Sequence, residues 1–558
     1  MQNNHKILYI ILILFFSCNL SDNNSNKKYF KGMVVSAHPE ASKIGLDILK
    51  KGGNAVDASI AVQYALAVCY PIAGNLGGGG FMVYRSSEGE YAALDFREMA
   101  PIESHRDMYL DSNGNPEEWK SLYGCLSAGV PGTVNGLFTA HKRYGRLSMQ
   151  DLIEPSIRLA KNGFKLTKRQ ANNLNNAASD FKKYNKEGIY LFKEGGWEKG
   201  DVLIQKDLAN TLTDIKEYGL SGFYKGKTAD KIIETMQKGE GIISKKDLLN
   251  YSSVWRKPIT GKYKDITFTS MPLPSSGGIL LKQLLKMSEQ LDFSKIKYHS
   301  SKYIHWLSEM ERRVYSDRSE FLGDTDFIKV PLEQLCSDTY IIDRFQTIDS
   351  SIASKSIDIN HGNIVYESEE TTHLSVVDGD GNAVSVTTTI NGAYGSRTFV
   401  KDCGFLLNNE MNDFSIKAGH PNLYGLVGSK ANEIVSQKRM LSSMTPTILE
   451  KEGELYMILG SPGGSTIITS VFQTILNVVE YNMGMQEAVN QSRFHHQWKP
   501  DVIFMEKDKF NCQSNLKSIG HDIKERNSIG RVDAILVLPD GSYEGGADPR
   551  GDDSKMGY

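Results

Sequence analysis

The sequence predicts an α/β protein built as a four-layer α/β/β/α sandwich, in a chain of 558 residues. Three observations favour this fold class: the order of the elements, one helix that is apolar on most sides, and a pair of alternating strands after Thr371. Helices and a hairpin come first, a mostly helical section covers about 130–345, and a strand-rich section follows. Sheets covered by helices on both faces fit that order. A simpler α/β sandwich fits the same pattern, and the length also allows two lobes.

Two helices open the chain. An amphipathic helix is expected over 40–51, and the glycines at 52–53 end it. Asn54 then caps a second helix over 55–70, made almost entirely of Ala, Val, Ile and Leu. A helix without a polar face must be buried between layers.

The remaining elements follow from apolar periodicity and from glycine and proline positions. A hairpin is expected at 81–84 and 91–96, and helices are expected at 149–162 and 303–321. Four strands follow, at 372–377, 383–390, 446–450 and 455–460, and a last helix at 466–481.

The strands at 372–377 and 383–390 are joined by a turn cluster, DGDGN, and their alternation predicts one buried face and one polar face. If Val377 pairs with Ala383, then Thr371 stands opposite Thr389. Opposite Cβ atoms lie about 4.5–5.5 Å apart, within reach of a hydroxyl–hydroxyl hydrogen bond. A slip of one residue would destroy this pairing. Threonine also favours strands without any function, and that reading stays open on spacing alone.

Thr371 follows a charged stretch, ESEE, at 367–370. A threonine hydroxyl is a poor nucleophile unless a base lies beside it, and chain cleavage before Thr371 would supply its own α-amine. Such an amine has a pKa of about 7.7–8.0, so part of it is unprotonated near neutrality. The chemistry indicated is attack on an amide bond.

Composition excludes some classes of function. The net charge is −2 and no long basic run occurs, which argues against nucleic acid as a main partner. Cys69, Cys125, Cys336, Cys403 and Cys512 are widely spaced without any CxxC pair. They are expected to be buried free thiols, not disulfide or zinc ligands.

The first residues predict export. A polar start with one lysine precedes ten apolar residues, 7–16, which suit a secretory signal and are too few to span a bilayer. The sequence FFSC at 15–18 resembles a bacterial lipoprotein processing site. We expect a lipoprotein-type signal peptide over 1–18, lipidation of Cys18, a polar tether over 19–32, and a periplasmic or lipid-anchored location. A plain cleaved signal is the alternative.

The segment TTHLSVVD at 371–378, followed by GNAV at 381–384, resembles the start of the small subunit of the γ-glutamyltranspeptidases (glutathione hydrolases). Further matching segments occur in order along the chain, at 52–58, 77–81, 95–98, 129–134, 274–278, 441–444, 460–464 and 547–550. The resemblance implies an N-terminal-nucleophile hydrolase, made as one precursor and cleaved between Glu370 and Thr371. The products would be a large subunit (33–370) and a small catalytic subunit (371–558), paired as a heterodimer. The family's nucleophile is the first threonine, Thr371.

The resemblance also assigns roles to the other site residues. A γ-glutamyl group carries an α-carboxylate and an α-ammonium, so its site needs a cationic fork and anions. The expected carboxylate-binding residues are Arg97, Ser442 and Ser443; the expected ammonium-binding residues are Asn391, Glu410 and Asp413; the expected oxyanion-hole residues are Gly463 and Gly464; and Tyr424 is expected to cover the substrate from a lid loop at 416–438. Glu410 departs from many bacterial relatives, which carry glutamine there.

Each of these residues, considered without the family resemblance, also has a simple structural explanation. Arg97 is more often a surface ion pair, and 407–414 reads as a solvated acidic loop. The glycines at 463–464 lack the lysine and spacing of a phosphate-binding loop. His495 and His496 are adjacent, so they do not share one face, and we expect core or hydrogen-bonding roles and no metal. The implied mechanism requires no metal and no organic cofactor.

The predicted substrates are glutathione, related γ-glutamyl compounds and amino acid or peptide acceptors. Two rivals stay open: a cephalosporin acylase of the same fold acting on glutaryl side chains, and an unprocessed, lipid-anchored binding protein. Glutaryl has no α-ammonium, so Glu410 and Asp413 argue against the first. The intact set of candidate site residues argues against the second.

Overall fold

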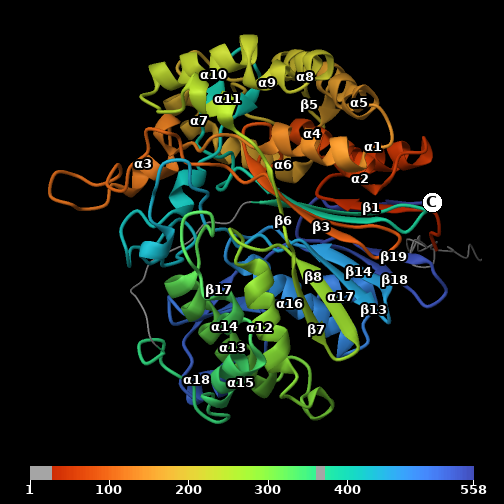
Figure 1. Ribbon diagram of the computed structural model, residues 1–558, viewed down its shortest axis with the longest axis vertical. Coiled ribbons are helices and arrows are strands. Elements are labelled where there is room, and N and C mark those ends of the chain that lie inside the picture. Colours follow the sequence, from red (N-terminus) through yellow and green to blue (C-terminus); the bar gives the residue numbers. More distant parts are fainter. Residues whose placement is uncertain (1–27, 360–370) are drawn as a thin grey trace, which may run out of the picture.

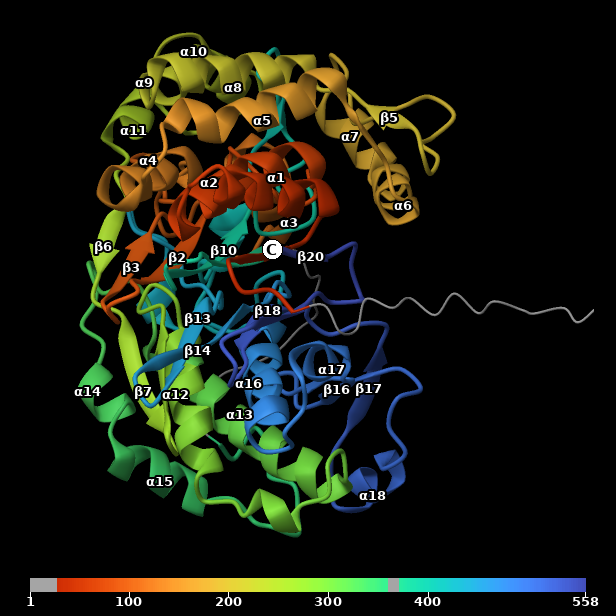
Figure 2. The ribbon, with the colours of Figure 1, turned by 90° about the vertical axis from the view of Figure 1, so that its right-hand side faces the viewer.

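The computed structural model describes residues 28–359 and 371–558. Two β-sheets lie face to face in the middle of the molecule, with helices on the outer side of each (Figure 1). The side view in Figure 2 shows the same order of layers, helix, sheet, sheet, helix. The predicted four-layer sandwich is therefore confirmed. Within these two ranges, no helix has both the length and the apolar character needed to cross a bilayer.

The first sheet has seven strands, in the spatial order β20 (Ser554–Gly557), β1 (Met33–Ser36), β9 (Thr372–Val377), β10 (Ala383–Thr389), β2 (Gly79–Arg85), β3 (Tyr91–Asp95) and β6 (Val254–Arg256). Both predicted subunits contribute strands, because β9 and β10 lie between β1 and β2. Neither part of the chain could form this sheet alone.

The second sheet has six strands, in the order β19 (Tyr543–Gly546), β18 (Asp533–Val537), β14 (Glu454–Gly460), β13 (Thr447–Lys451), β8 (Ile266–Ser270) and β7 (Ile259–Tyr263). The expectation of a mostly helical middle section missed β6, β7 and β8. These strands have three to five residues each, and β8 becomes an interior strand because β13 pairs with it.

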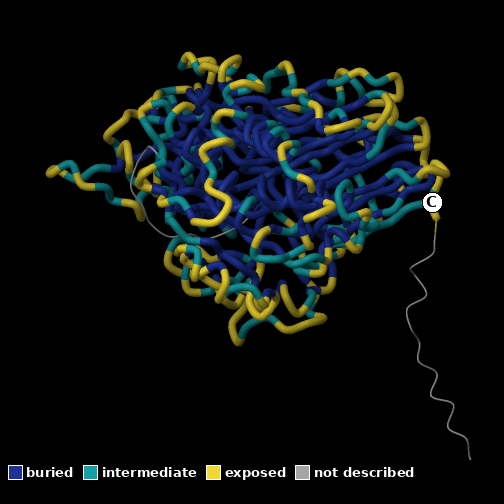
Figure 3. Tube along the Cα trace, turned by 90° about the horizontal axis from the view of Figure 1, so that it is seen from below, coloured by how far each residue is buried: buried dark blue, intermediate teal, exposed yellow. Residues whose placement is uncertain are grey.

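Helices α1 (Pro39–Lys50), α2 (Ala55–Cys69), α4 (Thr133–Tyr144), α5 (Met149–Asn162), α8 (Lys206–Tyr218) and α10 (Gly226–Lys238) share one hydrophobic core with the outer face of the first sheet. Helices α12 (Gly277–Ser288), α13 (Ser301–Phe321), α15 (Asp338–Gln346), α16 (Thr466–Val479) and α17 (Met485–Asn490) share another with the second sheet. A third core lies between the sheets. Figure 3 shows these buried layers in dark blue beneath an exposed rim.

The predicted element bounds agree with the structure to within about two residues for α1, α2, α5, α13 and the four predicted strands after Thr371. Helix α2 is buried along its whole length, as its apolar composition predicted. Asn54 caps it in a capping box with Asp57, each side chain accepting from the other's backbone N–H.

The β9–β10 hairpin has the expected apolar face and polar face, but every residue of both strands is buried, so the polar face does not meet water. The polar side chains face the second sheet. Ser375 donates to the carbonyl of Asp533 at 3.1 Å, and Ser385 donates to that of Leu459 at 3.0 Å. A four-layer fold leaves no face of its inner sheets to water, so polar residues there must be hydrogen-bonded.

The described end of the predicted tether, residues 28–32, lies beside the last strand, where the N–H groups of Phe30 and Lys31 donate to the carbonyl of Tyr558. The predicted signal peptide with Cys18, and Glu370 of the predicted cleavage site, fall outside the described residues. The five predicted thiols are free; three are buried, whereas Cys336 and Cys512 are half-buried.

Candidate active site

The register of the β9–β10 hairpin sets the position of Thr371. Val377 pairs with Ala383, Ser375 with Ser385 and Thr372 with Thr388, so the predicted register is confirmed. Thr371 lies directly before β9, and Thr389 is the last residue of β10. Thr371 is only 4 % exposed, although it lies outside the strand.

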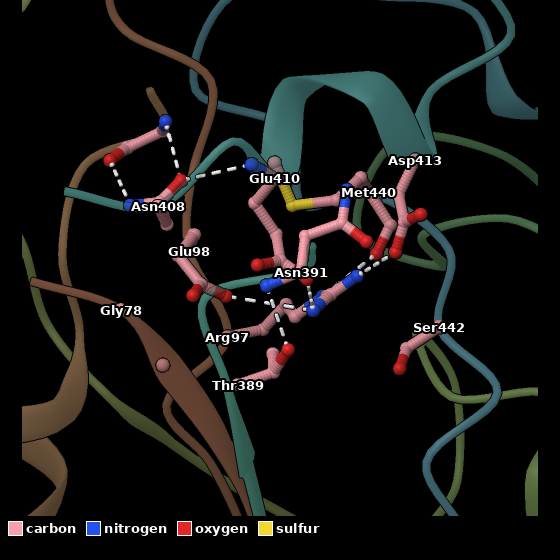
Figure 4. Close-up of polar contacts among 12 residues, drawn as sticks. Gly78, Arg97, Glu98, Thr389, Asn391, Asn408, Glu410, Asp413, Met440 and Ser442 are labelled. Carbon is pink, nitrogen blue, oxygen red and sulfur yellow. Dashed lines mark hydrogen bonds and ion pairs between the residues drawn. The ribbon is translucent and has the colours of Figure 1, made fainter. Parts of the chain in front are cut away.

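Thr389 has a different hydrogen-bond partner from the one expected. Its hydroxyl oxygen accepts the backbone N–H of Asn391 at 2.7 Å (Figure 4). Among residues 28–359 and 371–558, no hydrogen bond joins the hydroxyls of Thr371 and Thr389. Asn391 itself has φ +66°, and its side-chain NH₂ donates to the carbonyl of Asn409 at 2.9 Å. Thr389 therefore fixes the turn that carries Asn391.

A narrow cavity brings most of the predicted site together. It is lined by Thr371, Thr389, Arg97, Asn391, Glu410, Asp413, Tyr424, Ser442, Ser443 and Gly464, with Arg318, Leu426, Met444 and Ile467. Thr371 reaches this cavity and Thr372 does not. Gly463 does not line the cavity; a Cβ placed on it would lie 2.5 Å from the Thr466 hydroxyl and 3.1 Å from the Cα of Gly530.

Arg97 is the electrostatic centre of the cavity. It follows β3, and its N–H donates to the Asp95 carboxylate at 2.9 Å. One terminal nitrogen of its guanidinium pairs with Glu410 and lies 3.5 Å from Glu98; the other pairs with Asp413 at 2.5 Å (Figure 4). The side chain is 1 % exposed, so the alternative of a surface ion pair is wrong.

Three buried carboxyl groups thus surround one guanidinium. Burial raises the pKa of Glu98 to about 7 and raises the pKa values of Glu410 and Asp413, although Arg97 acts in the opposite direction on all three. Burial lowers the pKa of Arg97, but Glu410, Asp413 and Glu98 together raise it above its usual range. One guanidinium cannot neutralise three buried carboxylates, so the carboxyl pKa values rise.

Several polar atoms around the cavity have no hydrogen-bond partner within the described ranges. They are the side-chain oxygen of Asn391, one carboxyl oxygen of Glu410 and the hydroxyl of Ser443, all buried. Buried polar groups in folded proteins are almost always satisfied. A set of unsatisfied acceptors and donors that converge on one cavity is typical of a site for a polar ligand.

The loop after β14 carries the two candidate oxyanion-hole glycines. Gly463 and Gly464 have φ values of +130° and +51°, which glycine adopts without strain. In the described part of the chain, no acceptor is found for either backbone N–H group. Gly464 lines the same cavity as Thr371, and a donor without a partner there suits the stabilisation of a developing oxyanion.

Tyr424 lies over this loop. Its hydroxyl donates to the carbonyl of Asn391 at 2.8 Å, and a Cβ placed on Gly464 would lie 2.2 Å from the tyrosine ring. The ring therefore packs directly on the glycine, and only a residue without a side chain fits beneath it. Tyr424 is 4 % exposed.

Sequence reasoning missed two charged residues of the site. Glu98 lies in the matching segment at 95–98, yet only the fold shows that it shares a guanidinium nitrogen of Arg97 with Glu410. Arg318 lies on α13, far from the other site residues in the sequence; it lines the cavity, and burial lowers its pKa to about 10. No local pattern distinguishes Arg318 from the other arginines of that helix.

The two adjacent histidines have hydrogen-bonding roles, as expected. His495 lies between the Thr469 hydroxyl and the Gln497 amide, and His496 accepts the N–H of Trp498 at 3.0 Å.

A separate group, His305, Glu309 and His521, is close enough to hold a metal ion. Its two imidazoles are hydrogen-bonded to each other at 2.8 Å, and both Glu309 oxygens accept from arginines. Two guanidinium groups repel a dication, so this group is a hydrogen-bonded ion-pair network.

Comparisons with known proteins agree with this geometry. The γ-glutamyltranspeptidase family profile matches residues 41–558. The glutathione hydrolase proenzyme of Escherichia coli is 45 % identical over 533 residues, covering 95 % of this chain and 92 % of the relative. The corresponding proenzyme of Bacillus subtilis strain 168 is 38 % identical, covering 93 % and 90 %.

Solved structures support both the fold and the family. The Helicobacter pylori γ-glutamyltranspeptidase is 45 % identical with a TM-score of 0.57, covering 58 % of this chain and 94 % of that one. The cephalosporin acylase of Bacillus halodurans has a TM-score of 0.83 over 98 % of this chain and 99 % of that one, but only 24 % identity, and thus shows the fold alone. The matched profile and the full-length relatives establish that the chain belongs to the γ-glutamyltranspeptidase family.

Proposed function

We propose that the protein is a self-cleaving γ-glutamyltransferase and glutathione hydrolase. The precursor is cut between Glu370 and Thr371, and Thr371 then attacks the γ-glutamyl amide of glutathione and related compounds. The observation that carries this proposal is a single cavity holding both the Thr371 residue and the Arg97–Glu410–Asp413 cluster. Relatives named glutathione hydrolase proenzymes support it.

The charges around Arg97 favour a zwitterionic acyl group. Arg97 is paired with Glu410 and Asp413. A γ-glutamyl group exchanges these pairs for equivalent ones, because its α-carboxylate takes the guanidinium and its α-ammonium takes the two carboxylates. Ser442 and Ser443 add hydroxyls for the carboxylate, and the unsatisfied oxygen of Asn391 accepts from the ammonium.

The proposed reaction begins when the freed α-amine of Thr371 takes the proton of its own hydroxyl. The oxygen attacks the γ-carbonyl carbon, and the N–H groups of Gly463 and Gly464 stabilise the oxyanion. The C–N bond breaks, the departing amine receives the proton, and a γ-glutamyl ester of Thr371 remains. Water releases glutamate from this ester, or an amino acid or peptide amine takes the acyl group. Thr389 keeps Asn391 in place, and Tyr424 covers the site.

A glutaryl acylase is the second candidate, since a cephalosporin acylase shares the fold. A glutaryl group has a carboxylate for Arg97 but no ammonium. It would separate Arg97 from Glu410 and Asp413 without supplying a counter-charge, and unpaired buried carboxylates are strongly unfavourable. Faster turnover of a glutaryl anilide than of a γ-glutamyl anilide would favour this candidate.

The experiment that tests the proposal compares Thr371→Ala with Thr372→Ala. We expect Thr371→Ala to give one uncleaved chain without activity on γ-glutamyl anilides, while Thr372→Ala is cleaved. Denaturing gels and N-terminal sequencing of the small fragment read out the cleavage. An active, two-chain Thr371→Ala protein would refute the proposed nucleophile.

We also propose that the protein is exported and anchored by a lipid on Cys18, in the periplasm or on a bacterial membrane, after removal of residues 1–17. The support is the pattern of the first 18 residues. Intact-mass measurement of protein from the native membrane fraction tests it: a large-subunit mass that starts at Cys18 and includes a diacylglyceryl group is expected, and an unmodified mass would refute the anchor.

A further inference from the structure

Gln497 touches two parts of the candidate active site without lining its cavity. We infer that Gln497 is a positioning residue that ties the lid loop (416–438) to the loop carrying Gly463 and Gly464, and so holds Tyr424 over the bound acyl group. The inference rests on the proposed function and adds a residue that acts through Tyr424.

The contacts of Gln497 connect three segments of the chain. Its side-chain NH₂ donates to the backbone carbonyl of Tyr424 at 3.0 Å. Its side-chain oxygen accepts from the Ser465 hydroxyl at 2.7 Å and lies 2.9 Å from Nε2 of His495. Gln497 is 2 % exposed, and Ser465 and His495 are fully buried.

These partners allow only one orientation of the amide. A backbone carbonyl only accepts, so the NH₂ must face Tyr424 and the oxygen must face His495 and Ser465. Nε2 of His495 then carries the proton, and Nδ1, which lies 2.9 Å from the Thr469 hydroxyl, is unprotonated. Burial lowers the pKa of His495 to about 3, so the ring stays neutral and this arrangement persists across physiological pH.

Tyr424 is consequently held at two ends. Its hydroxyl bonds to the carbonyl of Asn391, on the wall that also holds Thr389. Its backbone carbonyl accepts from the side-chain NH₂ of Gln497, a residue that does not line the cavity. Between the two ends its ring lies on Gly464. Loss of the Gln497 bond would remove the contact that holds the Tyr424 carbonyl, while the Tyr424 N–H still donates to the Asn422 side chain at 2.9 Å and the hydroxyl still bonds to Asn391.

Gln205 provides a matched control. It is also fully buried, its NH₂ donates to the carbonyl of Val68 at 2.7 Å, and its oxygen lies 2.8 Å from the Tyr190 hydroxyl, whose proton is shared with the carbonyl of Gly404. These contacts lie in the helical layer over the first sheet and do not include the lid loop. Gln205→Leu therefore removes the same kinds of hydrogen bond at a distance from the site.

The experiment compares Gln497→Leu with Gln205→Leu in the mature two-chain enzyme, with a γ-glutamyl anilide as substrate. Both substitutions should lower Tm by similar amounts. Only Gln497→Leu should raise KM, by about tenfold, since one buried hydrogen bond to the lid is lost. Only Gln497→Leu should also speed trypsin cleavage at the lid lysines Lys417 and Lys430. Equal KM values and equal cleavage rates in the two variants would overturn the inference.

A double substitution tests whether Gln497 acts through Tyr424. In a Tyr424→Ala background, Gln497→Leu should change KM less than twofold, because the side chain it positions is already gone. Full additivity of the two changes would refute the positioning role.

If Gln497→Leu does not mature, Gln497→Glu replaces it. Its KM relative to wild type should rise from pH 5 to pH 8, as the carboxyl loses the proton that it donates to Tyr424, and a flat ratio would refute the inference. Wild-type enzyme without γ-glutamyl turnover would instead refute the proposed function.

Discussion

Replacement of Arg97 by lysine separates the binding of the acyl group from the chemistry at Thr371. Lysine keeps one positive charge but loses the planar fork, so it cannot bond Glu410 and Asp413 through two nitrogens at once. It also offers the substrate carboxylate one donor direction where the guanidinium offers two. A hydrogen bond to a charged group contributes about 1.5–3 kcal/mol. With about 1.4 kcal/mol per tenfold change, KM for γ-glutamyl substrates should rise roughly 10–150-fold.

The value of kcat should change much less, because lysine at position 97 leaves Thr371 and the glycine loop untouched. Stability should also fall, since the buried carboxyls of Glu98, Glu410 and Asp413 would share a weaker counter-charge. Steady-state kinetics on a γ-glutamyl anilide and urea unfolding of the same preparation measure both effects.

Arg493→Lys is the control for this experiment. Arg493 is 2 % exposed and pairs with Asp548 at 2.9 Å, outside the cavity. The Arg493→Lys variant should be less stable than the wild type, without a comparable rise in KM. An unchanged KM in Arg97→Lys, or the same rise in Arg493→Lys, would show that Arg97 does not bind the substrate carboxylate.

Three further predictions concern the site and its scaffold. Burial raises the pKa of Glu98 from an ordinary value near 4.5 to about 7. Between these two values the folded state holds a proton that the unfolded state has lost. The free energy of unfolding should therefore fall as the pH rises across this range. Glu98→Gln should remove about 1–3 kcal/mol of that fall, seen as a smaller difference between urea unfolding at pH 5 and pH 8; an unchanged slope would contradict the shift. Gly464→Ala puts a Cβ 2.2 Å from the Tyr424 ring at φ +51°, so it should lower kcat/KM at least tenfold in a cleaved, folded protein, with partial recovery when Tyr424→Ala is added; normal kinetics would mean that the ring moves freely. Asn54→Ala removes half of the capping box on α2 and should cost about 1 kcal/mol in urea unfolding with KM unchanged, whereas a raised KM would link this helix to the site.

Local patterns predicted the hairpin and the first helices well, because their determinants lie close together in the chain. The turn at 378–382 and the alternation on either side of it fixed the pairing of Val377 with Ala383. Asn54, followed by Asp57, fixed the start of α2. The short strands β7 and β8 were missed because β8 becomes a strand by pairing with the distant β13, and β7 in turn pairs with β8.

Long-range contacts decided the chemistry around Arg97. The family resemblance supplied Arg97, Glu410 and Asp413 as separate residues, and only the fold brought Glu98 and Arg318 to the same cavity. Burial then raised the carboxyl pKa values, which depend on surroundings that no local pattern describes.

The sequence by itself determined the fold class, the position of Thr371 at the start of an inner strand, and the residue types that a γ-glutamyl site needs. Hydrophobic periodicity and turn residues, which are local properties of the chain, supplied the first two, and the family resemblance supplied the third. Only the tertiary structure decided that the polar face of the hairpin is buried against a second sheet and that Gln497 connects the lid to the glycine loop. Those outcomes depend on which distant side chains meet once both sheets have closed on each other, and burial between the layers leaves each polar group only the partners that the fold supplies.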